Sequence, residues 1–198
     1  MAVCRQLHDE YAPLLYGNNT FVLFVAYDSI SFRFRWLLPS GLAPSSNREF
    51  LELHPSKYLK LVKRVIVTVD HVDSYTGMIK FNVGGKGLTH GLRAQVQKLV
   101  DALNPTEQAQ SCTSSESSGS NAQGLKRISL RLLNGNDILD AEKCTIVRNR
   151  ETSIRGVEEV QTVLEPFAQM RGLLDVSIVG AVADDFSASL KKQMMSAE

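Results

Sequence analysis

The sequence predicts an α/β domain built on a mostly parallel sheet. Three segments rich in aliphatic residues alternate with amphipathic segments that have a helical period. These three segments are residues 63–70, 125–132 and 174–179. Strand–helix alternation of this kind implies right-handed crossovers, which place successive strands parallel in one sheet. We therefore expect Val65, Ile128 and Val176 to lie side by side in three parallel strands.

Each of these strands is followed by a predicted helix, whose apolar residues recur every three or four positions. The helices are residues 88–103, 157–170 and 186–195, with inward stripes of Leu92, Val96, Leu99, Val100 and Leu103, of Val160, Val163, Leu164 and Phe167, and of Phe186, Leu190 and Met194. Pro166 must kink or split the second helix, because proline lacks an amide hydrogen. The units fit either a one-sided stack, like an irregular leucine-rich array, or a sheet with helices on both faces.

A helix–strand unit is predicted before these repeats. The helix, residues 2–16, carries apolar side chains on one face. These are Val3, Leu7, Tyr11 and Leu14. Tyr16 is expected to pack at the helix end, and Gly17 to adopt a positive φ that reverses the chain. Residues 20–25 then predict a strand that is buried on both faces and lies at one end or edge of the sheet.

Residues 29–38 fit two structures. Large apolar side chains alternate with polar ones, which is typical of a strand. The same aromatic residues also suit a helix that stops at Pro39. We favour the helix, because a segment that follows a buried strand often crosses back over the sheet. Residues 39–48 are rich in Pro, Ser, Gly and Asn and predict a loop.

Residues 106–123 are predicted to be a disordered insertion in a single domain that spans residues 1–198. The segment contains six serines, few apolar residues and no periodicity. Burial therefore cannot offset the conformational entropy that ordering would cost. A linker between two domains is the alternative.

Composition argues against several classes of partner. The net charge is +1, from 22 basic and 21 acidic residues, so the bulk charge does not favour nucleic acid or a membrane surface. No apolar run reaches the roughly 20 residues of a membrane-spanning helix, and the N-terminus lacks the apolar block of a secretory signal. The cysteines, Cys4, Cys112 and Cys144, form a poor disulfide framework. We expect an intracellular protein, cytoplasmic or nuclear, with no nucleic-acid or membrane partner.

The best candidates for acid–base or metal chemistry are Asp70, His71 and Asp73. They follow the predicted strand 63–70, and ligands collect at the carboxyl ends of parallel strands. A solvated loop is nevertheless the favoured interpretation. The cysteines have no CxxC or CxH spacing. The sequence therefore predicts no catalytic residue, no metal ligand and no cofactor.

Three further motifs remain, and two of them have both a functional and a structural interpretation. Residues 84–87, Gly-Gly-Lys-Gly, precede a helix, where phosphate can bind, but they match neither the P-loop nor the dinucleotide-binding pattern. We expect a flexible turn, with Thr89 as the helix N-cap. Asp184 and Asp185 are expected to form the cap and first turn of the last helix. A basic run suits phosphate contact or, as we favour, a solvated face. It consists of Lys57, Lys60, Lys63 and Arg64.

The opening segment contains Cys4-Arg5-Gln6 and, further along, Leu14-Leu15-Tyr16-Gly17-Asn18-Asn19-Thr20-Phe21. This segment resembles a block of filamentous-fungal F-box-like proteins, in which a Cys-Arg-Gln helix is followed by a Leu-Leu-Tyr-Gly-x-Asn-Thr-Phe motif and a strand. Residues 61–67 and 164–173 are more loosely similar to later elements of that family.

The resemblance implies a binding role. Members of the family usually begin with an F-box-like helix ahead of the Cys-Arg-Gln helix. Met1 lies almost directly before this block, so we expect an N-terminally truncated member that lacks the helix on which an adaptor protein would dock. The leading hypothesis is a non-catalytic protein-interaction module with an unknown protein partner. The alternatives are a small intracellular enzyme with a site in the strand-exit loop 70–73, and an inactive structural remnant.

Overall fold

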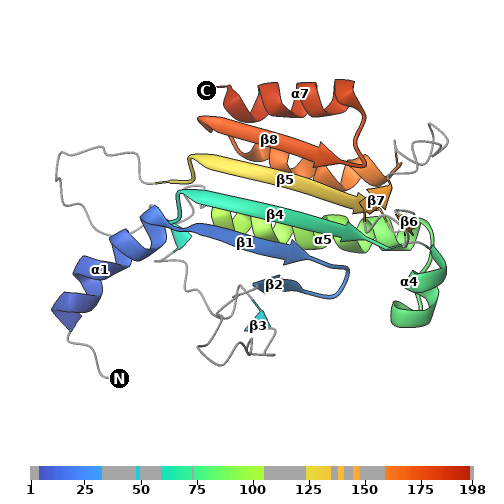
Figure 1. Cartoon of the computed structure of the whole chain (residues 1–198), viewed down its shortest axis with the longest axis horizontal. Coiled ribbons are helices and arrows are strands. Elements are labelled where there is room, and N and C mark those ends of the chain that lie inside the picture. The colour runs from blue at the N-terminus through green and yellow to red at the C-terminus, as the bar shows by residue number, and fades with distance from the viewer. Residues whose placement is uncertain are drawn as a thin grey trace, which may run out of the picture.

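A computed structural model shows a six-stranded sheet with helices on one of its faces (Figure 1). The structure describes residues 5–32, 48–49, 59–72, 74–104, 124–134, 138–140, 145–147 and 159–196. The strand order is β3-β2-β1-β4-β5-β8. These strands are β1 (Thr20–Val25), β2 (Ile30–Phe32), β3 (Arg48–Glu49), β4 (Arg64–His71), β5 (Arg127–Asn134) and β8 (Asp175–Gly180).

Four neighbouring strands, β1, β4, β5 and β8, are parallel. Val65 is the register partner of Ile128, and Ile128 is the register partner of Val176. The predicted row across three parallel strands is therefore confirmed, and with it the α/β class and the mostly parallel sheet. The strands form because β-branched and aliphatic residues suit a pleated surface that is buried on at least one face.

The sheet continues beyond β1 with antiparallel strands, which corrects three predictions. Residues 30–32 form β2, not a helix, and pair with β1, with Val25 opposite Ile30. A tight connection makes this possible, because the amide of Ala26 donates to the carbonyl of Ser29 over 2.9 Å and returns the chain directly into the sheet. Since β2 lies beside it, β1 is an interior strand, and the prediction that it lies at one end or edge of the sheet is wrong. Residues 33–47 lie outside the described residues, and Arg48 belongs to β3 rather than to the expected loop.

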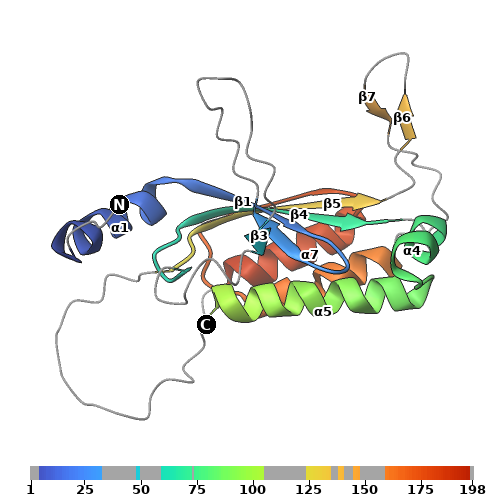
Figure 2. The same cartoon turned by 90° about the horizontal axis from the view of Figure 1, so that it is seen from below.

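Three helical segments cover the same face of the sheet (Figure 2). They are α5 (Lys86–Leu103), the 3-10 helix η1 (Thr162–Gln169) and α7 (Asp184–Met195). Among the described elements, no helix covers the opposite face. The helices thus have the one-sided arrangement, while the likeness to a leucine-rich array stays a prediction. Two further helices, α1 (Arg5–Asn18) and α4 (Ser74–Phe81), lie at opposite ends of the strands.

The core lies between the sheet and these three helical segments. Alternate residues of the strands point into it, among them Leu23, Val67 and Leu130, which are fully buried. The inward stripes predicted for α5 and η1 are buried, and Leu190 and Met194 of α7 are buried beside a half-buried Phe186. In contrast, Val22 and Phe24 are only half-buried. The prediction that β1 is buried on both faces is therefore wrong, because no described helix covers its second face.

The helix predicted over residues 157–170 is only partly α-helical. Residues 159–161 form a short helical turn, and Thr162–Gln169 continue as the 3-10 helix η1 with Pro166 inside it. Proline cannot donate a backbone hydrogen bond and clashes with the turn before it, which explains the change of helix type. The amide of Met170 donates to the carbonyl of Phe167 over 3.0 Å and ends the element.

The structure contains elements that the sequence pattern did not predict. These are α4 and a two-stranded antiparallel sheet of β6 (Ile138–Asp140) and β7 (Thr145–Val147). The predicted insertion 106–123 and the three cysteines, Cys4, Cys112 and Cys144, lie outside the described residues. None of the described helices is long and apolar enough to cross a membrane.

Candidate functional site

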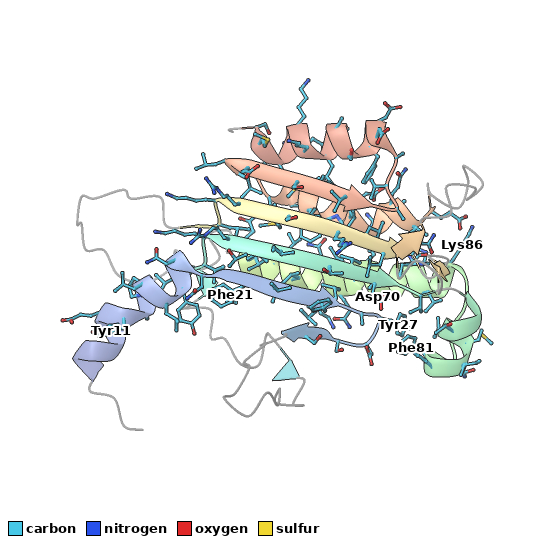
Figure 3. All side chains as sticks on the ribbon, in the orientation of Figure 1. Tyr11, Phe21, Tyr27, Asp70, Phe81 and Lys86 are labelled. Atoms are coloured by element: carbon cyan, nitrogen blue, oxygen red, sulfur yellow. The ribbon has the colours of Figure 1, made fainter. Side chains whose placement is uncertain are left out.

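The parallel strands end together at one edge of the sheet, where the sequence places its acid–base candidates. Asp70 and His71 are the last residues of β4, and His71 is the register partner of Asn134 on β5. The aromatic ring of Tyr27, which follows β1, packs against Phe81 of α4 with 4.9 Å between ring centroids (Figure 3). This strand-exit edge is thus bordered by α4 and by the start of α5.

Asp70 and His71 do not form one site. Successive residues of a strand point to opposite faces, so the exposed Asp70 lies on the open face and His71 on the face that α5 covers. Asp73 lies outside the described residues. Within the described ranges, no group of three or more His, Cys, Asp or Glu side chains is arranged to hold a metal ion.

His71 instead contacts α5. Its Nε2 atom lies 3.3 Å from the Oγ1 hydroxyl of Thr89, while its Nδ1 atom is buried without a hydrogen-bond partner. Burial lowers the pKa of His71 below 6.5 because it disfavours the charged ring, and a backbone hydrogen bond and the Asp70 carboxylate act more weakly in the opposite direction. The structure therefore favours the neutral imidazole.

This burial predicts a pH-dependent stability. Below pH 6.5, the ordinary pKa of histidine, the unfolded chain takes up a proton at residue 71 more readily than the folded chain. The free energy of unfolding should therefore be fully retained above about pH 6.5 and fall as the pH drops towards the lower pKa of the folded state. In His71→Gln this contribution should vanish, and urea unfolding followed by circular dichroism across about pH 5 to 8 measures it.

His90 provides the matched control, because its side chain is exposed on α5. His90→Gln should keep the slope of stability against pH that the wild-type chain shows. If His71→Gln and the wild type have the same slope, the burial of His71 does not govern this pH range.

The turn predicted for the Gly-Gly-Lys-Gly segment is shorter than expected, because Lys86 and Gly87 already belong to α5, and the N-cap also differs from the prediction. Gly85 has φ 54 and is the N-cap of α5, so Thr89 lies inside the helix, where its hydroxyl contacts His71. The amides of Gly87 and Leu88 donate to carbonyls of the same turn, over 3.2 and 3.1 Å. These amides are therefore engaged in the turn and are not directed at an anion.

A second feature is an exposed apolar face on α1, which we call the α1 stripe and define as Tyr11, Leu14 and Leu15. These side chains are 61%, 56% and 56% exposed. The predicted helix is confirmed in type, but Tyr11 and Leu14 do not pack inward as an amphipathic helix on a sheet would. The reason is that α1 projects beyond the end of the strands, so that no described strand lies beneath it (Figures 1 and 3).

The base of α1 is anchored to the sheet. Tyr16 stacks on Phe21 of β1 with 5.5 Å between ring centroids and 3° between planes, as predicted for the helix end. Gly17 lies within α1 and is not among the glycines with positive φ, so the predicted reversal at this residue is wrong. A Cβ atom there would be in ordinary van der Waals contact, 3.4 Å from Cε and Nζ of Lys63, so the side chain of Lys63 lies against this position without requiring a glycine.

Basic residues from two distant segments meet at the N-terminal edge of the parallel strands. We call this cluster the basic edge, and it consists of Lys60, Lys63, Arg64, Lys126 and Arg127. The amides of Lys126 and Arg127 both donate to the carbonyl of Lys63, over 2.9 and 3.0 Å. The sequence pattern indicates only the first segment, because β4–β5 pairing alone brings the second beside it. Lys57 lies outside the described residues.

The last helix partly matches its prediction. The N-cap of α7 is Ala183, while Asp184 and Asp185 lie in the first turn. Carboxylates there interact favourably with the positive end of the helix dipole. Neither is at the cap position, so the pair stabilises α7 through the helix dipole and not as an N-cap.

Comparison with family models, with curated proteins and with solved structures finds no match for this chain.

Proposed function

We propose that this chain is a non-catalytic protein-interaction module that binds its partner through the α1 stripe. One observation carries the proposal: three large apolar side chains are more than half exposed side by side on a helix that projects from the sheet. Single exposed apolar residues are ordinary, whereas a contiguous group favours a contact surface. Positions 11, 14 and 15 have the i, i+3, i+4 spacing through which helices present a face to a partner.

Two further points support a binding role. The similarity of residues 3–21 to fungal F-box-like proteins implies binding and includes the α1 stripe. The alternative of an enzyme with a site in the loop 70–73 has less support, because Asp70 and His71 lie on opposite faces of the sheet. The hypothesis of an inactive remnant differs from ours in a testable way, since it expects no loss of binding when the α1 stripe is changed.

The test is the double variant Leu14→Ser/Leu15→Ser. Partner proteins that co-purify with the tagged wild-type chain from its native host should be depleted by about tenfold or more, because truncating central apolar contacts removes much of the binding energy. Quantitative mass spectrometry of the purified complexes measures the depletion. Size-exclusion chromatography of the pure chain shows whether the partner is a second copy.

A matched control is available on α4. Met78 and Ile79 are also adjacent in sequence and exposed, at 53% and 67%, so Met78→Ser/Ile79→Ser makes the same chemical change elsewhere. Both double variants should keep the wild-type unfolding temperature, because surface substitutions usually change stability by less than about 0.5 kcal/mol each. Equal partner recovery from the two variants, or no enrichment over an untagged sample, would falsify the proposed role of α1.

A further inference from the structure

We infer that the α1 stripe and the basic edge form one docking surface, and that its occupant is an acidic amphipathic helix of a partner protein. The inference rests on the proposed function and specifies the chemistry of the partner at the same site. It follows from three properties of the described residues: the two features adjoin, the edge gathers positive charge, and the apolar spacing suits a helix.

The two features adjoin where α1 meets β4. The guanidinium of Arg64 donates a hydrogen bond to the carbonyl of Asn18, the last residue of α1. The side chain of Lys63 lies against Gly17, one residue earlier. The basic edge therefore begins at the end of the helix that carries the α1 stripe, and a single ligand segment can contact both.

The basic edge concentrates positive charge. Arg64 is the register partner of Arg127, and paired strands lie about 4.8 Å apart. Within the described part of the chain, no ion pair joins Lys63, Lys126 or Arg127 to a carboxylate. The register partners across the four parallel strands are Thr20, Arg64, Arg127 and Asp175. Asp175 is the one carboxylate among these four residues.

The opposite end of the strands carries charges of both signs. Exposed carboxylates follow β1, end β4 and begin α7 there, namely Asp28, Asp70, Asp184 and Asp185, and the exposed Lys80 and Lys86 lie on α4 and at the start of α5. With a net charge of +1, the strand-exit edge is therefore mixed in charge, whereas five basic side chains meet at the basic edge. Like charges at the basic edge repel one another, so a ligand rich in carboxylates relieves this repulsion and is attracted to this edge rather than to the opposite one.

The α1 stripe indicates a helical protein ligand. Side chains at i, i+3 and i+4 form a ridge that packs into the grooves of a second helix. Tyr11 offers a ring on which a base can stack, but Leu14 and Leu15 offer neither a ring nor a hydrogen-bonding group for phosphates. A nucleic acid would thus leave the two leucines unused, whereas an acidic amphipathic helix contacts all three residues of the α1 stripe and the basic edge.

The probe for the experiment is a fluorescein-labelled peptide of about 20 residues, long enough to form several helical turns. It carries leucine at helical i, i+3, i+4 and i+7 positions and glutamate elsewhere, and a second peptide replaces every glutamate with lysine. Fluorescence anisotropy with the full chain should give at least about tenfold tighter binding of the acidic peptide. Raising the salt from about 50 to 200 mM should weaken this binding, because salt screens exposed charges.

Charge reversal tests the site itself. Lys126→Glu/Arg127→Glu should weaken the acidic peptide by about tenfold and strengthen the lysine peptide, because the sign of the local charge is exchanged. Lys191→Glu/Lys192→Glu reverses two adjacent exposed lysines on α7 and should leave both affinities near the wild-type values. Leu14→Ser/Leu15→Ser should weaken both peptides, since both use the α1 stripe.

The outcomes separate this inference from the proposed function. The acidic-helix inference fails if both peptides bind equally, or if charge reversal leaves both affinities unchanged. The proposed binding module still stands in either case, provided that Leu14→Ser/Leu15→Ser releases the cellular partners. If a single-stranded oligothymidylate displaces the acidic peptide at equal concentration and binds Leu14→Ser/Leu15→Ser undiminished, the surface is a polyanion site and the inference is overturned. If neither cellular partners nor peptides depend on Leu14 and Leu15, both proposals fail.

Discussion

Gly180→Ala is expected to destabilise the fold by about 2 to 6 kcal/mol, which combines backbone strain with a steric clash. Gly180 has φ 113, a conformation that side-chain-bearing residues rarely adopt, and a Cβ atom there would lie 2.0 Å from the carbonyl oxygen of Leu132. That oxygen belongs to the neighbouring strand β5, where Leu132 is the register partner of Gly180. Relief therefore requires β5 and β8 to separate, and urea unfolding followed by far-UV circular dichroism measures the cost.

Substitutions at two other glycines separate the backbone strain from the steric clash in this loss of stability. Gly172 has φ 70 but nothing within 4 Å of its Cβ position, so Gly172→Ala isolates the backbone strain, at about 1 to 2 kcal/mol. Gly124 has neither a positive φ nor a neighbour within 4 Å, and Gly124→Ala should change stability by less than about 0.5 kcal/mol. A loss for Gly180→Ala no larger than that for Gly172→Ala would contradict the tight pairing of β5 with β8.

Phe167→Ala is expected to cost about 3 to 5 kcal/mol, the usual range for removing a buried aromatic ring. Phe167 is fully buried, and its element η1 packs against both α5 and α7. The substitution therefore leaves a cavity where the three helical segments meet beneath the sheet. Since single domains are stable by only about 5 to 15 kcal/mol, the variant should unfold at a much lower urea concentration or lose its cooperative transition.

Leu174→Ala is the control for this substitution. Leu174 is 67% exposed just before β8, so its truncation removes a similar apolar group without opening a cavity, and stability should change by less than about 0.5 kcal/mol. Similar losses for the two variants would mean that η1 does not close the core. A large loss for Phe167→Ala alone supports the packing of η1 between α5 and α7.

The elements predicted well are those with a long, regular pattern. The stripe from Leu92 to Leu103 correctly identified the buried face of α5, and the alternation within residues 125–132 identified β5. Within residues 29–38, the described residues 30–32 were assigned wrongly, because period-2 and helical patterns compete over a short segment. The turn that returns the chain from β1 to β2 decides between the two, and its hydrogen bond from Ala26 to Ser29 is a feature of the folded backbone.

The candidate site was predicted less well than the fold. The prediction groups Asp70 with His71 because they are adjacent, although adjacent residues of a strand point to opposite faces. The prediction also makes Thr89 a helix N-cap, whereas Thr89 lies inside α5 and contacts His71. The two errors have different causes. Alternation along β4 separates Asp70 from His71, whereas the packing of α5 against β4 brings Thr89 to His71, and residues 84–89 do not encode that packing locally.

The amino-acid order alone determined which segments are strands or helices and which of their faces are apolar, because a repeat of two or of about 3.6 residues is a property of the local chain. Tertiary structure decided which apolar faces are covered. The stripe on α5 is buried under the sheet, while the α1 stripe is exposed because its helix extends past the strand ends. Tertiary structure also brought residues 60–64 beside 126–127. Charges that far apart in sequence become neighbours only when β4 and β5 pair.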